Sequence, residues 1–439
     1  MSPELMSIIM FACLLIVLFS GLPIAFSMGG LAVIFGYLFW GPQCFYMFAS
    51  KTYGLMDNYI LVAAPLFIFM AMMVERSGIA DDLYHAMHVW FGPLRGGLAI
   101  ATILVCTVFA ATTGIIGASV VSMGLLALPA MLKRGYQPEL STGTICAGGT
   151  LGILIPPSLM LVVYGAYVGI SVGDLFAAAI LPGLLLSGLY IIYVGVLCHI
   201  RPDIGPPLPV EERKLGLKQK LALGAKSIVP PLFLILAVLG TILFGIATPT
   251  EAAGVGALGS IILVACYGKL SWSVLKETCY RTLRVTSMVV FLVIGASAFT
   301  SVFLGVGGGK SVENLLSGLQ IGPIGILAIM MFVLFILGMF IDWLAILLII
   351  IPVFIPVANK LGFDPLWFAL LICVNLQMSF LTPPFGYALF YLKGCAPPNV
   401  TLAHIYSGII PFVILQMVGL LLCIIFPEII LWLPNKLMK

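Results

Sequence analysis

Residues 129–164 of this chain read PAMLKRGYQPELSTGTICAGGTLGILIPPSLMLVVY, and the chain contains a second version of this stretch. At a constant shift of 227 positions, without a gap, it aligns with residues 356–391, PVANKLGFDPLWFALLICVNLQMSFLTPPFGYALFY. Ten of the 36 aligned pairs are identical, and four of these are proline pairs, although proline makes up only 28 of the 439 residues. A self-match at a fixed period indicates a repeat architecture. Because the period is half the chain, the sequence predicts two copies of one structural unit.

Composition predicts a membrane protein. Apolar residues make up 62% of the sequence and charged residues 8%, whereas a soluble domain carries about 25% charged residues. This number of charged residues is too small for a protein surface that faces water. We therefore predict an all-α polytopic membrane protein. The ten cysteines are scattered and form no C-x-x-C pair, which argues against a disulfide framework or a structural metal site. We expect no organic cofactor and no nucleic-acid partner.

Apolar runs recur in the same order in both halves, and each is long enough to cross a hydrocarbon core of about 30 Å. In the first copy, residues 1–200, they are 4–20, 23–40, 55–75, 97–132, 140–170 and 174–199. In the second copy, residues 227–439, they are 229–247, 251–268, 284–304, 323–358, 366–392 and 402–432. The only extended polar segment, residues 201–226, is predicted to connect the two copies.

One apolar block in each copy is too long for a single helix across the membrane core. Residues 97–132 contain no Asp, Glu, Lys or Arg, and their middle reads TTGIIGAS, 112–119. The matching block, 323–358, turns at GMFIDW, 338–343. A turn without a charged anchor predicts a re-entrant hairpin, which is tolerated only inside protein or beside a water-filled cavity. Two ordinary helices joined by a tight turn at the membrane surface are the alternative.

Each hairpin is followed by a helix that two prolines interrupt. The breaks are Pro156–Pro157 within 140–170 and Pro383–Pro384 within 366–392. Proline lacks an N–H donor and clashes with the preceding turn, so two in succession break a helix. A discontinuous helix at the corresponding place in two halves is typical of the midplane binding site of a secondary transporter. A structural kink in a packed helix is the alternative.

Basic residues predict the orientation of the chain in the membrane. Five crossings and one hairpin per copy give an odd number, so the second copy is inverted relative to the first. With residues 201–226 in the cytoplasm, the segments on that side hold 15 of the 20 Lys and Arg residues, which is the positive-inside pattern. The first hairpin then opens to the cytoplasm, the second opens to the outside, and both termini lie outside.

Several motifs resemble the large membrane subunit of TRAP (tripartite ATP-independent periplasmic) transporters. They are FAATTGIIGAS (109–119), GTLGILIPPS (149–158), FGIATPTEAA (244–253), LGMFID (337–342) and LTPPFG (381–386), and they occur in order across nearly the whole chain. The chain departs from the family at the first hairpin tip. Many members have S-G-S and an acid there, whereas this chain has Thr113, Gly114 and Ile115, with Ser119 at the acid's position.

The resemblance implies a bacterial inner-membrane permease, and no enzyme, that imports an organic acid by using a sodium gradient. It implies two partners, a small four-helix membrane subunit and a periplasmic solute-binding protein. It also implies an elevator-type movement of a transport domain against a scaffold domain. The alternative is a self-sufficient sodium/dicarboxylate symporter, or an antiporter, of related inverted-repeat fold. An intramembrane protease is disfavoured because there is one acid in the hairpin blocks and no H-E-x-x-H motif.

Residues at the turns and breaks supply the predicted binding site. Unwound backbone offers carbonyl oxygens, and Ser and Thr offer hydroxyls, to a hard cation such as sodium. Following the family's placement of sodium, the predicted ligands are Thr112, Thr113, Gly114, Ser119, Pro156, Gly338, Asp342, Thr382 and Pro383. The predicted substrate contacts are Thr150, Ser158, Asn375, Gln377 and Ser379. No metal other than sodium is expected.

Asp342 is the only acid in either hairpin block. An ionisable group at membrane depth is a functional candidate, although Asp is also a common N-cap residue. Asn375 and Gln377 could likewise hydrogen-bond a neighbouring helix instead of a ligand. We expect a carboxylate substrate between the two hairpin tips, where the amide dipoles of half-helices would face it.

Overall fold

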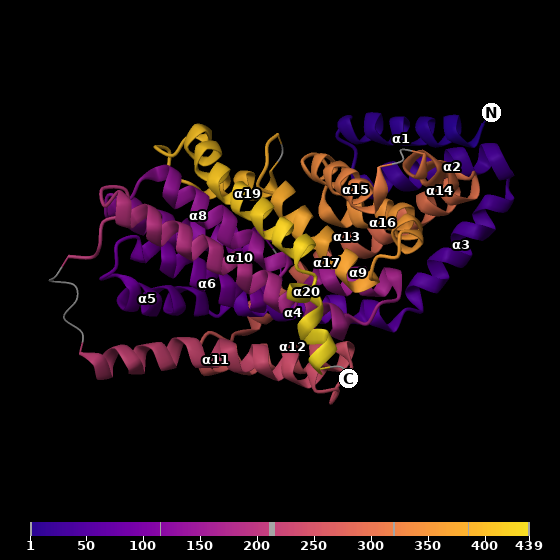
Figure 1. Ribbon diagram of the computed structural model, residues 1–439. Helices are drawn as coiled ribbons and strands as arrows, with labels where there is room; N and C mark the ends of the chain where they lie inside the picture. Colours follow the sequence, from indigo (N-terminus) through magenta and orange to yellow (C-terminus); the bar gives the residue numbers. More distant parts are fainter. Residues whose placement is uncertain (1, 115, 210–215, 319–320, 385, 438–439) are drawn as a thin grey trace.

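The computed structural model describes residues 2–114, 116–209, 216–318, 321–384 and 386–437, and these contain helices but no strand (Figure 1). The first half holds α1 (Pro3–Phe19), α2 (Ile24–Trp40), α3 (Gln43–Met56), η1 (Tyr59–Val62), α4 (Ala63–Arg76), α5 (Ile79–Phe91), α6 (Gly97–Thr113), α7 (Ile116–Lys133), α8 (Pro138–Thr150), η2 (Leu151–Ile153), α9 (Leu159–Val168) and α10 (Val172–Ile200). The second half holds α11 (Leu217–Leu243), α12 (Pro249–Cys266), α13 (Trp272–Gly305), α14 (Gly308–Ser317), α15 (Gly322–Gly338), α16 (Trp343–Lys360), α17 (Pro365–Ser379), α18 (Tyr387–Cys395), α19 (Leu402–Ile425) and α20 (Glu428–Leu437). The predicted all-α fold is confirmed.

Helix boundaries recur at the shift that the sequence match gives. Moved by 227 positions, α7 coincides with α16, and α8 begins where α17 begins. The hairpin α6–α7 corresponds to α15–α16, and the broken helix α8–α9 corresponds to α17–α18. In Figure 1, α5 and α6 lie at one end of the molecule while their counterparts α14 and α15 lie at the other, as expected for copies of opposite direction.

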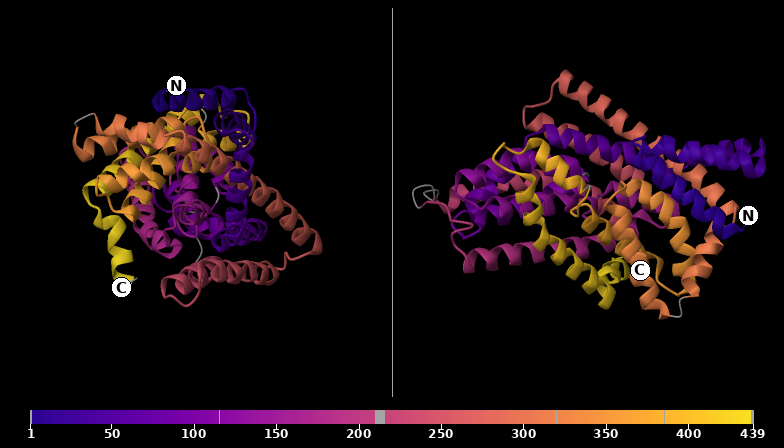
Figure 2. Two further views of the ribbon diagram at one scale, coloured as in Figure 1. Left: turned by 90° about the vertical axis from the view of Figure 1, so that its right-hand side faces the viewer. Right: turned by 90° about the horizontal axis from the view of Figure 1, so that it is seen from above.

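Eight described helical segments are long and apolar enough to cross a membrane, namely η1 with α4, α7, α10, α11, α12, α13, α16 and α19. The shorter apolar helices include α2 and the segments α6, α9, α15 and α17, which belong to the hairpins and the broken helices. The protein is therefore a multi-pass membrane protein in which long helices surround interrupted ones. α11 and α12 run side by side along the edge of the bundle, where α12 packs on α4 and α11 on α5 (Figures 1 and 2).

The two copies differ where the third apolar run was predicted. Residues 55–75 include the end of α3, η1 and most of α4, whereas α13 is one unbroken helix of 34 residues that begins before the predicted run 284–304. The Asn58 side chain explains the break, because it accepts a hydrogen bond from the Ile60 N–H (3.0 Å) and donates one to the Ala166 carbonyl (3.1 Å). At the corresponding position, Val285 offers no such competitor to the helix backbone.

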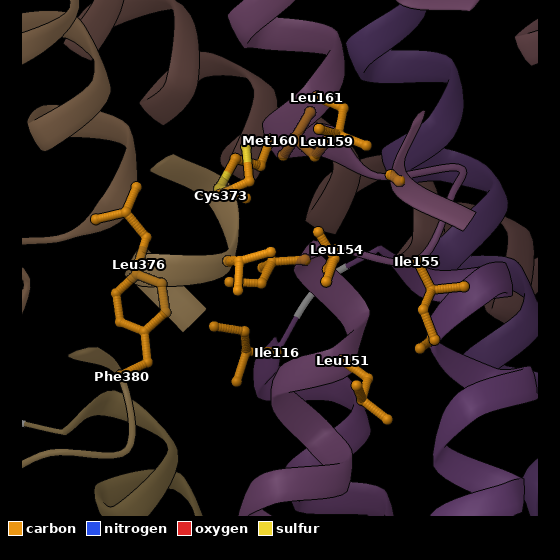
Figure 3. Packing of buried hydrophobic residues seen from close by; sticks show 14 of the residues in the cluster. Ile116, Leu151, Leu154, Ile155, Leu159, Met160, Leu161, Cys373, Leu376 and Phe380 are labelled. Atoms are coloured by element: carbon orange, nitrogen blue, oxygen red, sulfur yellow. The ribbon is translucent and has the colours of Figure 1, made fainter. Parts of the chain in front are cut away.

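The two broken helices pack around a common apolar centre. Buried Leu151, Leu154 and Leu159 of the first lie near Leu376 and Phe380 of the second (Figure 3). This apolar packing stabilises both helix breaks through dispersion contacts and through the burial of apolar surface.

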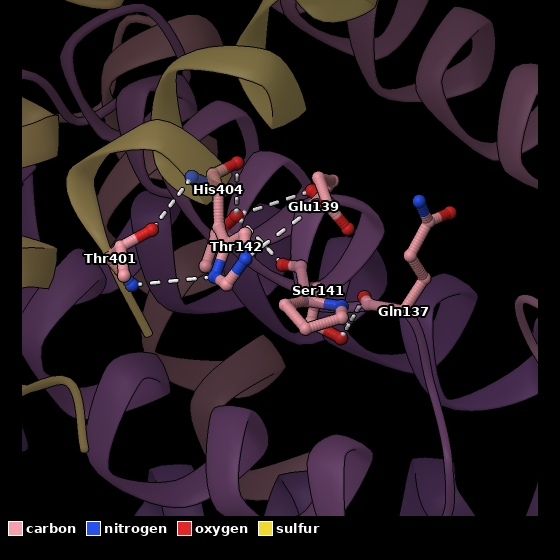
Figure 4. Close-up of polar contacts among 7 residues, drawn as sticks. Gln137, Glu139, Ser141, Thr142, Thr401 and His404 are labelled. Carbon is pink, nitrogen blue, oxygen red and sulfur yellow. Dashed lines mark hydrogen bonds and ion pairs between the residues drawn. The ribbon is translucent and has the colours of Figure 1, made fainter. Parts of the chain in front are cut away.

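Close crossing of α8 and α19 fixes the first broken helix against a long one. A Cβ on Gly143 would lie 2.1 Å from the Gly408 carbonyl oxygen, so only glycine permits this approach. At the end of the crossing, His404 Nε2 lies 3.9 Å from Glu139 Oε1, and Thr401 caps α19 by accepting from the His404 N–H (3.4 Å) (Figure 4).

Candidate functional site

The first hairpin tip lies directly against the first helix break. Gly114 ends α6 with a φ of +59°, a left-handed conformation that favours glycine. A Cβ at this position would lie 2.9 Å from the Pro157 carbonyl oxygen and 3.5 Å from Ser158 Cα. The turn and the break were predicted separately, and the structure brings them into contact.

The second hairpin tip meets the second break in the same way. A Cβ on Gly338, the last residue of α15, would lie 2.3 Å from Ser379 Cβ. Asp342 is the N-cap of α16, where its Oδ2 accepts a hydrogen bond from the Leu344 N–H (3.2 Å). The capping role that the sequence left open for Asp342 is therefore present. The peptide bonds Pro156–Pro157 and Pro383–Pro384 are both cis.

Three buried hydroxyls surround the first tip. Thr112 and Thr113 both donate to the Phe109 carbonyl, at 2.8 and 3.0 Å, and Thr113 Oγ1 lies 3.2 Å from Ser119 Oγ. At the adjacent break, Ser158 donates to the Ile153 carbonyl. A hydroxyl that donates its proton to a carbonyl still has lone pairs that a cation can use.

The hydroxyls of the second break are arranged similarly. Ser379 donates to the Asn375 carbonyl (3.2 Å), and Thr382 donates to the Met378 carbonyl (2.9 Å). Both bonds return to the preceding turn of the same helix, a common pattern for Ser and Thr inside membranes. The second tip also has a carboxylate, Asp342, whereas the described residues of the first tip include none.

A cavity of about 710 Å³ separates the two tips from α2 and α13. Gly114 and Gly117 border it on the first tip, and Asp342 borders it on the second. Two of the predicted sodium ligands, Gly114 and Asp342, therefore face one common space. Within the described part of the chain, no lysine or arginine lines this cavity.

Four helices begin at the wall of this cavity. The first residues of α7, α9, α16 and α18, namely Ile116, Leu159, Trp343 and Tyr387, all border it. Helix N-termini carry free N–H groups and a partial positive charge, so they attract anions. The cavity thus gathers positive dipole ends without burying a cationic side chain.

The opposite side of the cavity is apolar. It consists of Pro23–Phe26 at the start of α2 and of α13 residues Val285, Ser287, Met288, Val289, Phe291 and Leu292, a surface we call the scaffold wall. The rings of Phe26 and Phe291 pack edge to face with centroids 5.0 Å apart. Only the Ser287 hydroxyl gives this wall a polar side chain.

Sequence reasoning missed two tyrosines in the cavity. Tyr387 and Tyr391 of α18 both line it, as Asp342 does. A Cβ on Gly117 would lie 3.3 Å from Tyr391 Cζ, so this ring packs on the first tip. Their spacing of four residues, directly after the second proline pair, places them on one helix face and could have identified them.

The five predicted substrate residues lie elsewhere in this structure. Thr150 and Gln377, which the repeat relates, meet at 3.4 Å, and Gln416 Nε2 lies 3.4 Å from the same Thr150 hydroxyl. Asn375 donates to the Met331 carbonyl (2.6 Å). Together with Ser158 and Ser379 they are fully buried, and none of these residues, all of which the structure describes, borders the cavity. Their contact with substrate stays a prediction.

The remaining predicted sodium ligands stand around the two tips. Pro156 lies at the first break, next to the tip contact at Pro157, and Pro383 follows Thr382 at the second break. Among the residues that the structure describes, no group of three or more His, Cys, Asp or Glu could hold a metal ion.

Comparisons with known proteins agree with this architecture. The family model for the tripartite ATP-independent periplasmic transporter, DctM component, matches residues 11–429. The chain is 32% identical to a C4-dicarboxylate TRAP transporter large permease protein DctM of Pseudomonas aeruginosa, covering 93% of this chain and 94% of that protein. It is 31% identical to an ectoine/5-hydroxyectoine TRAP transporter large permease protein of Ruegeria pomeroyi, covering 85% and 86%.

A solved structure shares the fold at low sequence identity. The Alcanivorax borkumensis YdaH transporter, described as having an unusual topology, superposes with a TM-score of 0.64 at 16% identity over 97% of this chain and 99% of that one. The family match spans both hairpins, both proline breaks and the cavity between them. The chain therefore belongs to the DctM component family of tripartite ATP-independent periplasmic transporters, as a large permease subunit.

Proposed function

We propose that this chain is the large permease subunit of a sodium-coupled, binding-protein-dependent secondary transporter. It imports an organic acid across the bacterial inner membrane by an elevator mechanism. The observation that carries the proposal is the cavity bordered by the first residues of α7, α9, α16 and α18. Four converging helix N-termini favour a carboxylate, and nothing in this arrangement requires the chain to be an enzyme.

The cavity has the size and the polarity that a small organic acid needs. Its volume of about 710 Å³ falls within the 300–1,000 Å³ typical of small-molecule sites. Relatives are named for C4-dicarboxylates, ectoine and sialic acid. Here the carboxylate binds to N-terminal amides, with the hydroxyls of Tyr387 and Tyr391 beside them.

Sodium binds between each tip and its break. At the first tip, Thr112, Thr113 and Ser119 provide hydroxyl oxygens close to the Pro157 carbonyl. At the second, Asp342 provides a carboxylate on the tip whose Gly338 packs on Ser379, and Ser379 and Thr382 provide hydroxyls at the break. Such oxygen donors suit a hard cation, and the bound sodium would offset the charge of Asp342 while the site crosses the membrane.

The internal repeat indicates where the hairpin tips would lie after the elevator movement. The scaffold wall consists of the start of α2, on the predicted cytoplasmic side, and of the middle of α13. Its counterparts at the 227-residue shift are Thr250–Ala253 and Asn58–Pro65, and these two segments are in contact because Thr250 Oγ1 lies 3.4 Å from the Tyr59 carbonyl oxygen. In the elevator movement, the tips leave the scaffold wall and face these counterparts instead.

Matched cysteines test this movement. Ser287 lines the scaffold wall, and its counterpart is Ile60, so S287C and I60C are compared in a background without the ten native cysteines. We expect labelling by a membrane-impermeant thiol reagent to shift reciprocally, with S287C reacting from the cytoplasmic side and I60C from the outside. Accessibility that changes in parallel at both positions would contradict an elevator.

Two partners complete the transporter, a small four-helix membrane subunit and a periplasmic solute-binding protein. Support comes from relatives of different length. The chain covers 94% of the Pseudomonas aeruginosa permease but only 64% of the isethionate TRAP transporter permease protein DctMQ of Oleidesulfovibrio alaskensis. The additional third of that relative is consistent with a second membrane component, which this chain would take from a separate polypeptide.

Reconstitution distinguishes the proposal from its alternative, a self-sufficient sodium/dicarboxylate symporter or antiporter. The permease and its small subunit are placed in proteoliposomes with an inward sodium gradient, and uptake of labelled organic acids is measured with and without the binding protein outside. We expect uptake only when the binding protein and the sodium gradient are both present. Equal uptake without the binding protein would establish the alternative instead.

A further inference from the structure

A groove of about 830 Å³ runs along the paired helices α11 and α12, apart from the transport cavity. Its floor is tight, since a Cβ on Gly259 would lie 2.7 Å from Leu234 Cδ1. Its sides are exposed apolar residues, Phe233 (72% exposed), Leu258 (61%) and Ile262 (55%). Because these side chains are exposed, the groove is open to lipid.

The length of the groove matches one leaflet of the bilayer. On α12 it extends from Val255 to Cys266, and on α11 from Lys226 to Ala237. Eleven residues at 1.5 Å each give about 16 Å on both helices, and half of a hydrocarbon core is about 15 Å. A transmembrane helix of a partner would instead need a groove of full membrane depth, about 30 Å.

One end of the groove is polar and carries charges of both signs. Lys226, Lys269 and Asp82 border it there, and Tyr267 joins the two helices because its hydroxyl lies 3.4 Å from the Lys226 carbonyl oxygen. None of the three charged residues has a salt bridge to another described side chain. This end lies on the side predicted to face the cytoplasm.

The two lysines differ in their surroundings. Lys269 Nζ lies over the N-cap of α5, since a Cβ on Gly78 would lie 1.8 Å from Lys269 Nζ and 3.6 Å from Asp81 Oδ2. Lys269 is therefore close to an acid, whereas Lys226 and Asp82 offer one open positive and one open negative charge at the groove. A ligand that carries both a phosphate and an ammonium group complements this pair.

We propose that the α11–α12 groove binds a zwitterionic aminophospholipid of the inner leaflet, with an acyl chain along the groove. Its phosphate faces Lys226 and its ammonium group faces Asp82. The apolar length sets the depth of the chain, and the opposite charges favour phosphatidylethanolamine over phosphatidylglycerol, which has no ammonium group.

Native mass spectrometry of the purified full chain, after exchange into equimolar phosphatidylethanolamine and phosphatidylglycerol, tests the proposal. We expect one tightly retained phosphatidylethanolamine. D82N should lower the retention of phosphatidylethanolamine relative to phosphatidylglycerol about fivefold. K226Q should lower the retention of both lipids by a similar factor. In each variant about one contact between a charged side chain and the headgroup is lost. D81N is the matched control, because Asp81 lies in the same turn of α5 but does not border the groove.

Groove-filling variants provide a second, independent measurement. L258W should displace the acyl chain and lower lipid retention several-fold, whereas I414W, at a similarly exposed position on α19, should not. Retention unchanged by L258W, a preference for phosphatidylglycerol in the unmodified protein, or equal effects of D81N and D82N would each overturn the proposal. Loss of small-subunit binding by L258W with lipid retention intact would identify a protein partner instead.

Discussion

The two hairpin tips both pack on the neighbouring helix break and differ in their chemistry. Each ends in a glycine so close to the neighbouring break that a Cβ would collide, at Pro157 for Gly114 and at Ser379 for Gly338. Yet the hydroxyls of the first tip have apolar counterparts in the second, since Thr113 aligns with Phe340 and Ser119 with Ile346. Only the second tip has an acid among the described residues.

This comparison shows that the packing of the tips and their ligand chemistry impose different requirements on the residues. The duplication retains the proline pairs at the breaks, and each tip has a glycine of its own at the close contact. Ligand chemistry requires only that enough oxygen atoms be present. One tip therefore provides neutral oxygens and the other provides a carboxylate, so in the proposed mechanism the second tip is where charge crosses the membrane. Changes at the second tip should consequently have larger effects than changes at the first.

D342N should have the largest effect. Asparagine caps a helix about as well as aspartate, so α16 should keep its N-cap, while the negative charge beside the cavity is lost. We expect sodium-dependent uptake in proteoliposomes to fall by at least about a hundredfold, because about 3 kcal/mol is a typical cost of removing a charged hydrogen-bonding partner.

D342A provides the control for this variant. It removes the cap as well as the charge, so it should also unfold at a lower temperature by an amount equivalent to about 1 kcal/mol. If D342N transports normally and only D342A is impaired, Asp342 is a cap and the second tip has no special role.

Alanine at the tip glycines should destabilise the fold in a defined order. G338A places a Cβ 2.3 Å from Ser379 Cβ, G114A places one 2.9 Å from the Pro157 carbonyl, and G21A has open space around it. G21A should lower the stability by only about 1 kcal/mol, because alanine is strained in the left-handed conformation of this residue. At the two crowded sites overpacking should lower it by about 1–3 kcal/mol more. Thermal unfolding in one detergent should rank G338A as least stable and G21A as most stable; equal shifts would show that the tips are not packed on the breaks.

Removing hydroxyls should weaken sodium binding less than removing the carboxylate. T113V and T382V each delete one oxygen while keeping the side-chain shape, and each should raise the sodium concentration for half-maximal uptake about tenfold. T113A combined with T382A should abolish sodium-dependent uptake without loss of membrane expression. Unchanged sodium dependence in the double variant would reject both positions as ligands.

The smallest effect is expected at Tyr391, where the repeat supplies a control. Tyr391 lines the cavity, whereas its counterpart Tyr164 is 1% exposed and packs in the core. Y391F should raise the substrate concentration for half-maximal uptake about threefold to tenfold, through loss of one hydrogen bond of about 1 kcal/mol. Y164F should leave that concentration unchanged, and equal effects of the two variants would exclude a direct role for Tyr391.

More of the fold than of the candidate site could be predicted from the sequence. Proline pairs and glycines act on their own backbone, so the breaks and turns could be located from local rules, and the contact between Gly114 and Pro157 followed. The direction in which a side chain faces depends on how whole helices are rotated against each other. In this structure Asn375 and Gln377 hydrogen-bond neighbouring helices, so their contact with substrate stays a prediction, and the sequence analysis overlooked Tyr387 and Tyr391.

A structure of the assembled transporter with bound sodium and a carboxylate substrate would test the role of the cavity most directly. We expect substrate density between the tips, with a carboxylate within hydrogen-bonding distance of the N-terminal amides of α7 and α16 and with sodium beside Asp342. Substrate density away from these helix starts, or around Thr150 and Gln377 with the cavity holding only lipid or water, would contradict the site described above.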